Sequence, residues 1–224
     1  MKTPIKNIQF GILSDEDINR LSVCEVNNTR LCGMGSIYDA RMGVLDHKLL
    51  CSSCGKNNKE CPGHFGHISL SIKILHPLLY KYIHSLLKCV CFSCSRCLIS
   101  KEQLELNGIS HDTSRFNRVK ELCEKVNICY HCSEYKPKII YSTTENIFQS
   151  TIKEGNSLVK TDITDEEVKT VFDNMLEEDI ILLGLNPKYS NPSNLIMTKL
   201  MVLPPVARPY VIVDNMTCDD DLTV

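Results

Sequence analysis

Cysteine is the residue that most constrains how this chain can fold. The 224 residues include 13 cysteines, and ten of them fall into three short clusters between positions 51 and 132. The N-terminus does not read as a signal peptide, and no apolar run approaches the roughly 20 residues that a membrane-spanning helix needs. We therefore expect an intracellular chain, in which clustered cysteines bind metal rather than form disulfides.

The first cluster predicts a closed zinc site. It reads Cys51-Ser-Ser-Cys54 and, after six residues, Cys61-Pro-Gly-His64. Zinc prefers four nitrogen or sulfur ligands in a tetrahedron, and two ligands three positions apart can meet one ion within a single turn. His67 is a competing ligand, although the spacing favours His64. A set of three cysteines and one histidine leaves no open position, so we expect a structural ion.

The second predicted zinc site is assembled from two distant segments. One pair is Cys91 with Cys94, and the other is Cys129 with Cys132, and the segment between the pairs is long enough to contain a helix. Cys94 with Cys97 forms a competing pair. We prefer the first arrangement because Cys97 begins an apolar run that is typical of a buried segment.

Four further residues near these pairs are expected to lie outside the metal sites. Cys89, Cys97 and Cys123 are interpreted as small buried apolar side chains, the common fate of free cysteine. His131 is expected to be exposed rather than a ligand. Each filled zinc site could contribute on the order of 10–16 kcal/mol of apparent folding free energy, so removing the metal should unfold its surroundings.

Local patterns along the rest of the chain predict an α+β fold. Alternating apolar residues predict strands over Lys6–Leu13 and His67–Leu75, and a further strand is expected over Pro137–Ser142. Capping signals and apolar stripes predict helices over Ser14–Leu21, Pro77–Lys88, Ser114–Val126 and Thr164–Leu176. The polar stretch 143–162 is expected to be a loop or linker, and the proline-rich segment Leu203–Pro209 to lack regular structure.

Charge is distributed unevenly along the chain. Residues 1–142 contain 19 Lys and Arg against 13 Asp and Glu, whereas residues 143–224 contain 6 against 14. The first segment could therefore face a polyanion, although solvated surface lysines explain the same excess. The candidate phosphate contacts are Arg41, Lys48, Lys56, Lys59 and Arg208.

No catalytic motif is found in the sequence. A nucleophile with a base at hand, a glycine-rich phosphate loop and the His-x-Glu of zinc deaminases are all missing. The run Asp219-Asp220-Asp221 is the one dense carboxylate cluster, and consecutive side chains splay in different directions. We interpret it as an acidic surface loop, so no catalytic residue is predicted.

Several stretches together resemble the N-terminal region of the largest subunit of multisubunit DNA-directed RNA polymerase, of the eukaryotic, archaeal or large-DNA-virus type. The resemblance covers essentially the whole chain and is carried by KNIQFGI (6–12), GSIYDARMG (35–43), CPGHFGH (61–67), the cysteines over 89–94 and 123–132, LPPVARP (203–209) and DDDLT (219–223). The pairing of CPGHFGH with LPPVARP and DDDLT is the most specific part.

The resemblance implies a place and a role. This region of the family forms the clamp core, which closes over DNA and the RNA–DNA hybrid, with two structural Zn²⁺ ions at the cysteine clusters. It implies a clamp core over 1–142, a helical portion over 143–202 and a segment entering the lid loop over 203–224. The partners implied are the rest of the largest subunit, the second-largest subunit, the DNA template and the hybrid.

The chain also departs from the family pattern. The last two cysteines of the second site are closer together than in nuclear relatives, and the aspartate motif that holds the catalytic Mg²⁺ lies outside this chain. We therefore expect a fragment or one piece of a split subunit, inactive alone, located in the nucleus if cellular and eukaryotic or in a virion or host cell if viral. The alternative is a free-standing zinc-binding transcription adaptor.

Overall fold

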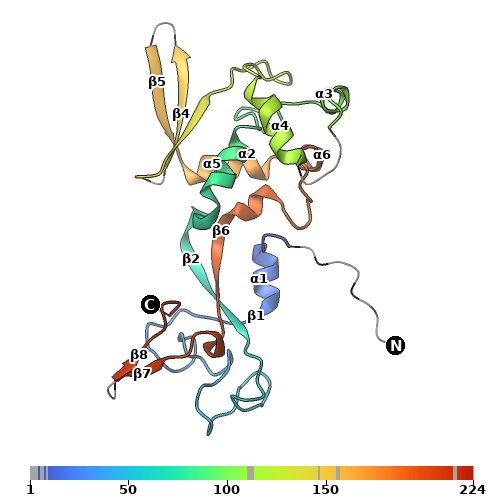
Figure 1. Cartoon of the computed structure of the whole chain (residues 1–224). Coiled ribbons are helices and arrows are strands. Elements are labelled where there is room, and N and C mark those ends of the chain that lie inside the picture. Colours follow the sequence, from blue (N-terminus) through green and yellow to red (C-terminus); the bar gives the residue numbers. More distant parts are fainter. Residues whose placement is uncertain are drawn as a thin grey trace. The chain divides into compact units, whose positions relative to one another are not determined.

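The structure is a computed structural model, and it describes residues 5, 8, 10–109, 114–145, 147–154, 157–213 and 216–223. Figure 1 labels its main helices and strands. The α-helices are α1 (Asp15–Leu21), α2 (Tyr80–Leu87), α3 (Lys101–Leu106), α4 (Arg115–Glu124), α5 (Asp165–Asp173) and α6 (Glu177–Leu182). The strands are β1 (Ser22–Glu25), β2 (Phe65–Leu75), β3 (Lys138–Ser142), β4 (Ile147–Glu154), β5 (Ser157–Ile163), β6 (Ile196–Val202), β7 (Val211–Val213) and β8 (Met216–Cys218). Short 3-10 helices cover Pro77–Leu79, Pro192–Leu195 and Pro205–Ala207. The α+β class predicted from the sequence is confirmed.

The chain divides into two compact units, each built from segments that are distant in sequence. The first unit combines Met1–Ile12 with Lys73–Ile196, and the second combines Leu13–Ile72 with Met197–Val224. A three-stranded sheet has the order β1-β2-β6, in which β1 and β2 are parallel. The boundaries 1–142, 143–202 and 203–224 follow the resemblance rather than this division, and they stay a prediction.

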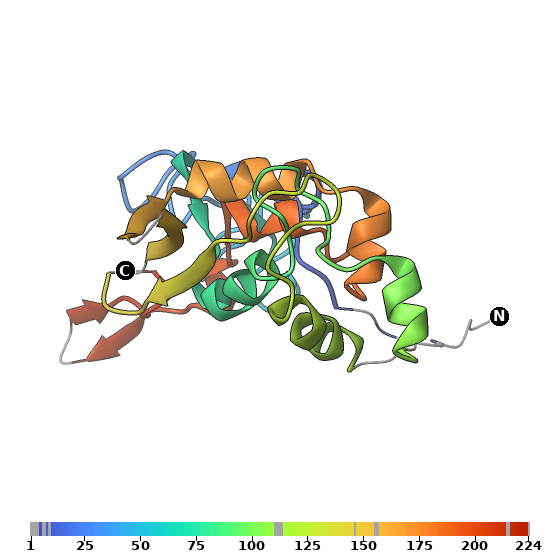
Figure 2. The same cartoon turned by 90° about the horizontal axis from the view of Figure 1, so that it is seen from above.

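The first unit contains a large apolar core. Twenty-five buried residues of the described chain form one cluster, to which α2 contributes Ile83, Leu86 and Leu87 and α5 contributes Val168 and Phe172. The antiparallel sheet β3-β4-β5 packs one face on this core through Ile139, Phe148 and Ile163. The strands β4 and β5 form a hairpin that extends from the helices of its unit in Figure 1, and Figure 2 shows the same elements from above.

The second unit has much less apolar material to bury. Its described apolar cluster consists of Cys24, Met42 and Val202, with Val26, Ile37 and Ile68 packed against it. Polar and charged side chains are buried in the same unit, namely Ser36, Asp39 and Arg208. This unit therefore depends on contacts other than apolar packing, and the candidate metal site described below is one of them.

Three helices begin at capping boxes, which explains why they start where they do. Ser14, Ser100 and Thr164 each accept a hydrogen bond from the backbone N–H three residues later, and the side chain at that later position accepts one in return. These bonds satisfy N–H groups that the helix leaves without partners. The predicted starts of α1 and α5 are confirmed, whereas α3 is a helix that the sequence interpretation missed.

Two expectations about strands are wrong. The stretch 143–162 is not a linker but contains β4 and β5, and the sequence signal that could have found the hairpin is the Gly155-Asn156 pair between the two runs. The predicted N-terminal strand does not form in residues 10–13, and Lys6, Asn7 and Gln9 lie outside the described residues. Ile8 and Phe10 are exposed, so no sheet covers this alternating pattern.

The other predicted elements are present. The strand expected over His67–Leu75 is β2, and the helix expected after Pro77 is the 3-10 turn that leads into α2. The proline-rich segment 203–209 contains only the 3-10 turn Pro205–Ala207. None of the helices in the described residues combines the length and the apolar character needed to cross a membrane.

Candidate metal centres

Three Cys-x-x-Cys turns of the chain have the same backbone geometry. In each, the N–H of the first cysteine donates to the carbonyl five residues later, and its own carbonyl accepts from the N–H four residues later. These donor–acceptor distances are 2.8–2.9 Å around Cys51, Cys91 and Cys129. The residue four positions on has a positive φ: Gly55 at 69°, Ser95 at 56° and Ser133 at 62°.

This geometry presents two thiols to one point. The tight turn brings the side chains of both cysteines to the same side of the loop, and the left-handed residue lets the chain leave it. Ser95 and Ser133 are the only non-glycine residues with positive φ in the described part of the chain. Since that conformation is unfavourable for serine, the strain is confined to the two turns of the second cluster.

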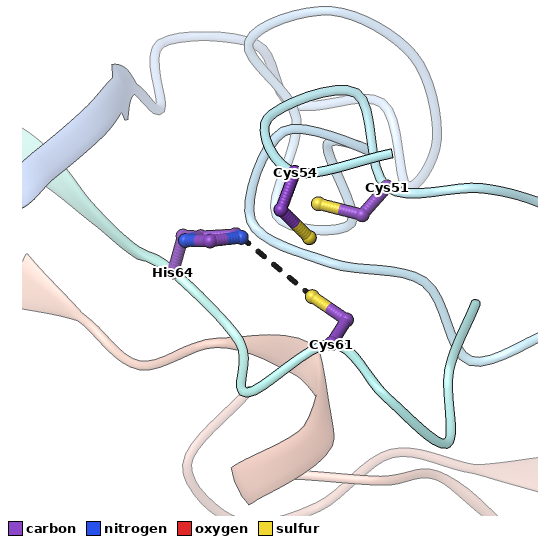
Figure 3. A group of neighbouring side chains, drawn as sticks. All are labelled: Cys51, Cys54, Cys61 and His64. Atoms are coloured by element: carbon purple, nitrogen blue, oxygen red, sulfur yellow. Dashed lines mark hydrogen bonds between the residues drawn. The ribbon is translucent and has the colours of Figure 1, made fainter. Parts of the chain in front are cut away.

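The first cluster brings together Cys51, Cys54, Cys61 and His64, all from the second unit. Their ligand atoms lie within 4.8 Å of one another, and Figure 3 shows the four side chains pointing toward a common centre. The Cys61 Sγ and His64 Nε2 atoms are 3.6 Å apart. An ion with Zn–S of about 2.3 Å and Zn–N of about 2.0 Å would place tetrahedral sulfur and nitrogen ligands about 3.5 Å apart, close to this distance.

Local hydrogen bonds orient Cys61 and His64. The His64 N–H donates to the Met42 carbonyl at 2.9 Å, and the Gly63 N–H donates to the Cys61 sulfur at 3.4 Å. The His64 imidazole lowers the pKa of the Cys54 thiol to about 6, whereas burial raises the pKa of the Cys61 thiol to about 11. The Cys54 thiol therefore loses its proton more readily than the Cys61 thiol before a metal ion is bound.

The second cluster brings together Cys91, Cys94, Cys129 and Cys132, all from the first unit. The Sγ atoms of Cys91 and Cys132 are 3.5 Å apart, and those of Cys94 and Cys129 are 3.7 Å apart. The edge of a Zn–S₄ tetrahedron is about 3.8 Å, so these separations suit a zinc ion bound by four thiolates. Burial raises the pKa of the Cys94 thiol to about 12, so a bound ion would have to displace its proton.

The structure also distinguishes between the alternative ligands. Cys89, Cys97 and Cys123 are fully buried and lie outside both ligand groups, as expected for apolar side chains. His131 is exposed. His67 lies outside the first group, and its Nδ1 is 2.8 Å from the Ser22 hydroxyl. The four residues preferred for each site are therefore the ones that converge, and the segment between Cys94 and Cys129 holds α3 and α4.

An ion pair links the second cluster to α6 within the first unit. The Arg96 guanidinium, from the turn between Cys91 and Cys97, donates to the Asp179 carboxylate at 2.6 Å. The Asp179 side chain is 0% exposed, and its Oδ1 atom has no hydrogen-bond partner in the described chain. No local sequence pattern signals this pair, because the two residues are 83 positions apart.

Arg208 is the residue that ties the second unit together. Its guanidinium donates to the Leu203 carbonyl at 2.9 Å and to the Thr223 hydroxyl at 3.2 Å, and it also donates to the Ile37 carbonyl. It lies over the Tyr38 ring, 5.1 Å from the ring centre, and is 0% exposed. The motifs over 35–43, 203–209 and 219–223 thereby meet at one buried charge.

Neighbouring contacts strengthen this meeting of motifs. The Tyr38 hydroxyl donates to the Asp219 carboxylate at 2.8 Å. A Cβ atom on Gly63 would come within 2.7 Å of side-chain atoms of both Pro204 and Val206, and the φ of Gly63 is 83°. Glycine is therefore required at this position both by its backbone conformation and by the close approach of the proline-rich segment.

The predicted phosphate contacts have different surroundings in the structure. Lys48, Lys56 and Lys59 are exposed and form no ion pair within the described residues. Arg41 is half-buried and pairs with Asp39 at 2.7 Å, which lowers the pKa of that carboxyl to about 2. The buried position of Arg208 gives it a structural role and does not support the contact predicted for it.

Comparisons with known proteins all find the same family. The family model described as "RNA polymerase Rpb1, domain 1" matches residues 2–224. The chain is 32% identical over 239 residues to a probable DNA-directed RNA polymerase II subunit RPB1 homolog of Invertebrate iridescent virus 6. It is 33% identical over 236 residues to the polymerase subunit Rpo1N of Methanocaldococcus jannaschii, and 35% identical over 245 residues to the polymerase III subunit RPC1 of Plasmodium falciparum.

These matches involve nearly all of this chain but only part of each relative. Each alignment covers 98% of the chain. The same alignments cover 23% of the viral relative, 17% of the archaeal relative and 10% of the Plasmodium relative. The similarity is therefore to one region of much longer subunits.

Proposed function

This chain belongs to the family of RNA polymerase Rpb1, domain 1, the N-terminal region of the largest subunit of DNA-directed RNA polymerase, and we propose that it forms the clamp core of such an enzyme. In this role it holds DNA and the RNA–DNA hybrid during DNA-templated transcription. The observation that supports the proposal most strongly is the family match over residues 2–224, joined to the two converging ligand groups.

The two ligand groups are proposed to hold structural zinc ions. Each group consists of four protein ligands, which leaves no position for a substrate or a reactive water. Bound zinc would supply cross-links between segments rather than chemistry. The first group joins two turns of the second unit, and the second group joins two turns that α3 and α4 separate in sequence.

Nucleotide addition is proposed to depend on residues outside this segment. Within the described residues, the groups suited to a metal ion are the two cysteine-rich ones, and no carboxylate cluster that would hold Mg²⁺ is among them. Asp219 accepts a hydrogen bond from Tyr38, and Asp220 accepts one from the Leu222 N–H, so this acidic run has a structural use. The chain would thus act in a nucleotidyltransferase without carrying its catalytic residues.

The proposed partners are the remainder of the largest subunit, the second-largest subunit, the DNA template and the hybrid. Lys48, Lys56 and Lys59 are the proposed phosphate contacts, because they are exposed and lie in the loops around the first ligand group. Such contacts add affinity without sequence preference and weaken as salt rises. The proposed location in the cell is that of the polymerase itself.

The proposal is tested by purifying the tagged chain from its native source and measuring metal and partners in the same sample. We expect two zinc ions per chain and co-purification with a subunit that carries the Mg²⁺-binding aspartate motif. Two zinc ions without polymerase subunits would support the adaptor alternative and contradict the clamp role. A sample without zinc would contradict both metal sites.

A further inference from the structure

The β3-β4-β5 sheet of the first unit has a second face that the core does not cover. Since successive side chains point to opposite faces of a strand, Lys138 and Ile140 lie on the face opposite the buried Ile139. On the other edge strand, Leu158 and Lys160 lie on that same outer face. A surface pocket opens there, and it includes Lys136 and Tyr135 from the segment that leads into β3.

One row of this face carries a pair of lysines around a hydroxyl. Thr151 of β4 pairs with Lys138 on one side and with Lys160 on the other, so the three side chains stand side by side across the sheet. The strands are about 4.8 Å apart, which places the lysines on either side of Thr151. The Thr151 hydroxyl oxygen is buried and has no hydrogen-bond partner in the described chain.

This row is suited to one carboxylate. A carboxylate above Thr151 would lie between two ammonium groups, and a χ1 rotation of Thr151 would turn its hydroxyl outward to donate to the carboxylate. The described residues that line the pocket include three lysines and no acidic residue. Asp162 lies on the same face, but it accepts a hydrogen bond from Gln149 at 2.9 Å and does not line the pocket.

Apolar side chains lie at opposite ends of this face. Ile140 of β3 is 40% exposed and Leu158 of β5 is 70% exposed, and both line the pocket. Their partners on β4 are Gln149 and Lys153, four residues apart. The two apolar groups are therefore about 16 Å apart along a diagonal that passes over Thr151, as the strand spacing and rise require.

We infer that this face, defined by Lys138, Ile140, Thr151, Leu158 and Lys160, binds an extended acidic segment of a partner protein. The segment has the pattern apolar–x–acid–x–apolar, because its outer side chains are then about 13 Å apart and flank a central carboxylate. A nucleic acid would satisfy the lysines but would leave two aliphatic side chains uncovered. The inference does not depend on the proposed clamp role.

The binding experiment uses the 224-residue chain and a fluorescein-labelled peptide in which Leu-Ser-Asp-Ser-Leu is the core. Fluorescence anisotropy is recorded against a peptide in which serines replace both leucines, and against oligothymidylate. We expect the leucine peptide to bind about tenfold more tightly than the serine peptide, since two apolar side chains lose their contacts. Equal binding of the two peptides, or tighter binding of oligothymidylate, would overturn the inference.

Charge-reversed variants locate the site. Lys138→Glu combined with Lys160→Glu is expected to weaken binding of the leucine peptide at least tenfold. The matched control is Lys81→Glu combined with Lys101→Glu, which reverses two exposed lysines of the same unit outside the pocket and should change affinity less than twofold. Equal loss in both variants would mean that only net charge matters, and the inference would fail.

A third variant separates loss of peptide binding from loss of the fold. Thr151→Val keeps the β-branched shape and removes the hydroxyl that has no partner, so the fold should tolerate it. We expect it to weaken the leucine peptide about fivefold while thermal unfolding and zinc content stay at wild-type values. Unchanged peptide affinity in Thr151→Val would show that no carboxylate sits above this residue.

Discussion

The two units of this chain differ in the contacts that stabilise them. In the described residues, the first unit buries a cluster of 25 apolar side chains, whereas the apolar cluster of the second unit has three. Apolar burial is the main favourable contribution to folding, so the second unit must draw its stability from other contacts. Its candidates are the Cys51, Cys54, Cys61 and His64 group and the buried guanidinium of Arg208.

The stability of the second unit depends on a few buried polar contacts, so the loss of one polar side chain should have a large effect. Arg208 donates to groups from three segments, so loss of its guanidinium would leave the Leu203 and Ile37 carbonyls without these hydrogen bonds. The first unit also contains an ion pair in which Asp179 is buried and Arg96 is partly exposed, but that unit has a large apolar core as well. The comparison therefore predicts that equal chemical changes have unequal consequences in the two units.

The largest effect is expected from loss of a metal ligand. Cys54→Ser should release one zinc ion and remove hydrogen-exchange protection over residues 35–75. The reason is that the apolar core of the second unit is too small to keep it folded without the ion. Cys132→Ser should also release one zinc ion, but α2 and α5 should keep slow exchange. Metal analysis and hydrogen-exchange mass spectrometry measure both responses.

The control for this pair is Cys32→Ser, which changes an exposed cysteine of the second unit outside the ligand group. It should leave zinc content and exchange unchanged. Retention of wild-type zinc content in Cys54→Ser would contradict the first site. If loss of either ion removed hydrogen-exchange protection equally from both units, the two units would not differ in what stabilises them.

The next largest effect is expected at Arg208. Arg208→Met keeps much of the apolar volume but removes the donors to Leu203, Ile37 and Thr223, and we expect it to destabilise the second unit by about 3 kcal/mol. Urea unfolding with excess zinc measures the change. The exposed Arg20→Met serves as the control and should change stability by less than about 0.5 kcal/mol.

A wild-type stability for Arg208→Met would have a clear meaning. It would show that the buried hydrogen bonds of the guanidinium only repay the cost of burying its charge. The zinc ion alone would then account for the stability of the second unit, which would sharpen the contrast with the first.

A smaller effect, dependent on pH, is expected at Asp39. Arg41 lowers the pKa of this carboxyl to about 2 in the folded chain, below its unfolded value of about 3.9. The ionised carboxylate therefore stabilises the fold above about pH 4, by roughly 2 kcal/mol, and this contribution is lost as the pH falls through 2. Asp39→Asn should be less stable than wild type at pH 7, and the difference should shrink below pH 4.

Wild type and Asp39→Asn should both release zinc in acid. The difference between their free energies of unfolding at each pH therefore isolates the contribution of the Asp39 carboxylate. The measurement is urea unfolding from pH 7 downward. A difference that stays constant with pH would mean that the Asp39 carboxylate contributes through shape rather than charge.

The smallest effect is expected in the turns of the second cluster. Ser133→Gly should stabilise the first unit by about 1 kcal/mol, because glycine adopts the positive φ of 62° without strain. Thermal unfolding of the zinc-bound chain measures it. Ser93→Gly is the control in the same unit, where φ is not positive and the added backbone freedom should lower the melting temperature. Destabilisation by both changes would contradict the shared turn geometry.

Sequence patterns were sufficient wherever a feature depends on neighbours along the chain. The Cys-x-x-Cys pairs, the capping boxes at Ser14 and Thr164, and the alternation of β2 all involve residues a few positions apart. The hairpin β4–β5 was missed because its alternation is weak: the polar pair Ser150 and Thr161 shares the inner face with Phe148 and Ile163, and the apolar Leu158 lies on the outer face. The alternation near Phe10 was misleading because no described strand pairs with it.

The sequence by itself determined which residues can bind metal, since thiol and imidazole groups at these spacings have few other uses in such a chain. For the second site the sequence favoured Cys91 and Cys94 with Cys129 and Cys132 but left Cys97 as a competing ligand, and the tertiary structure decided between them. Only the tertiary structure decided that Arg208 is buried instead of facing solvent. The physical reason is distance along the chain. Local geometry follows from adjacent residues, whereas burial and long-range pairing depend on how the whole chain packs.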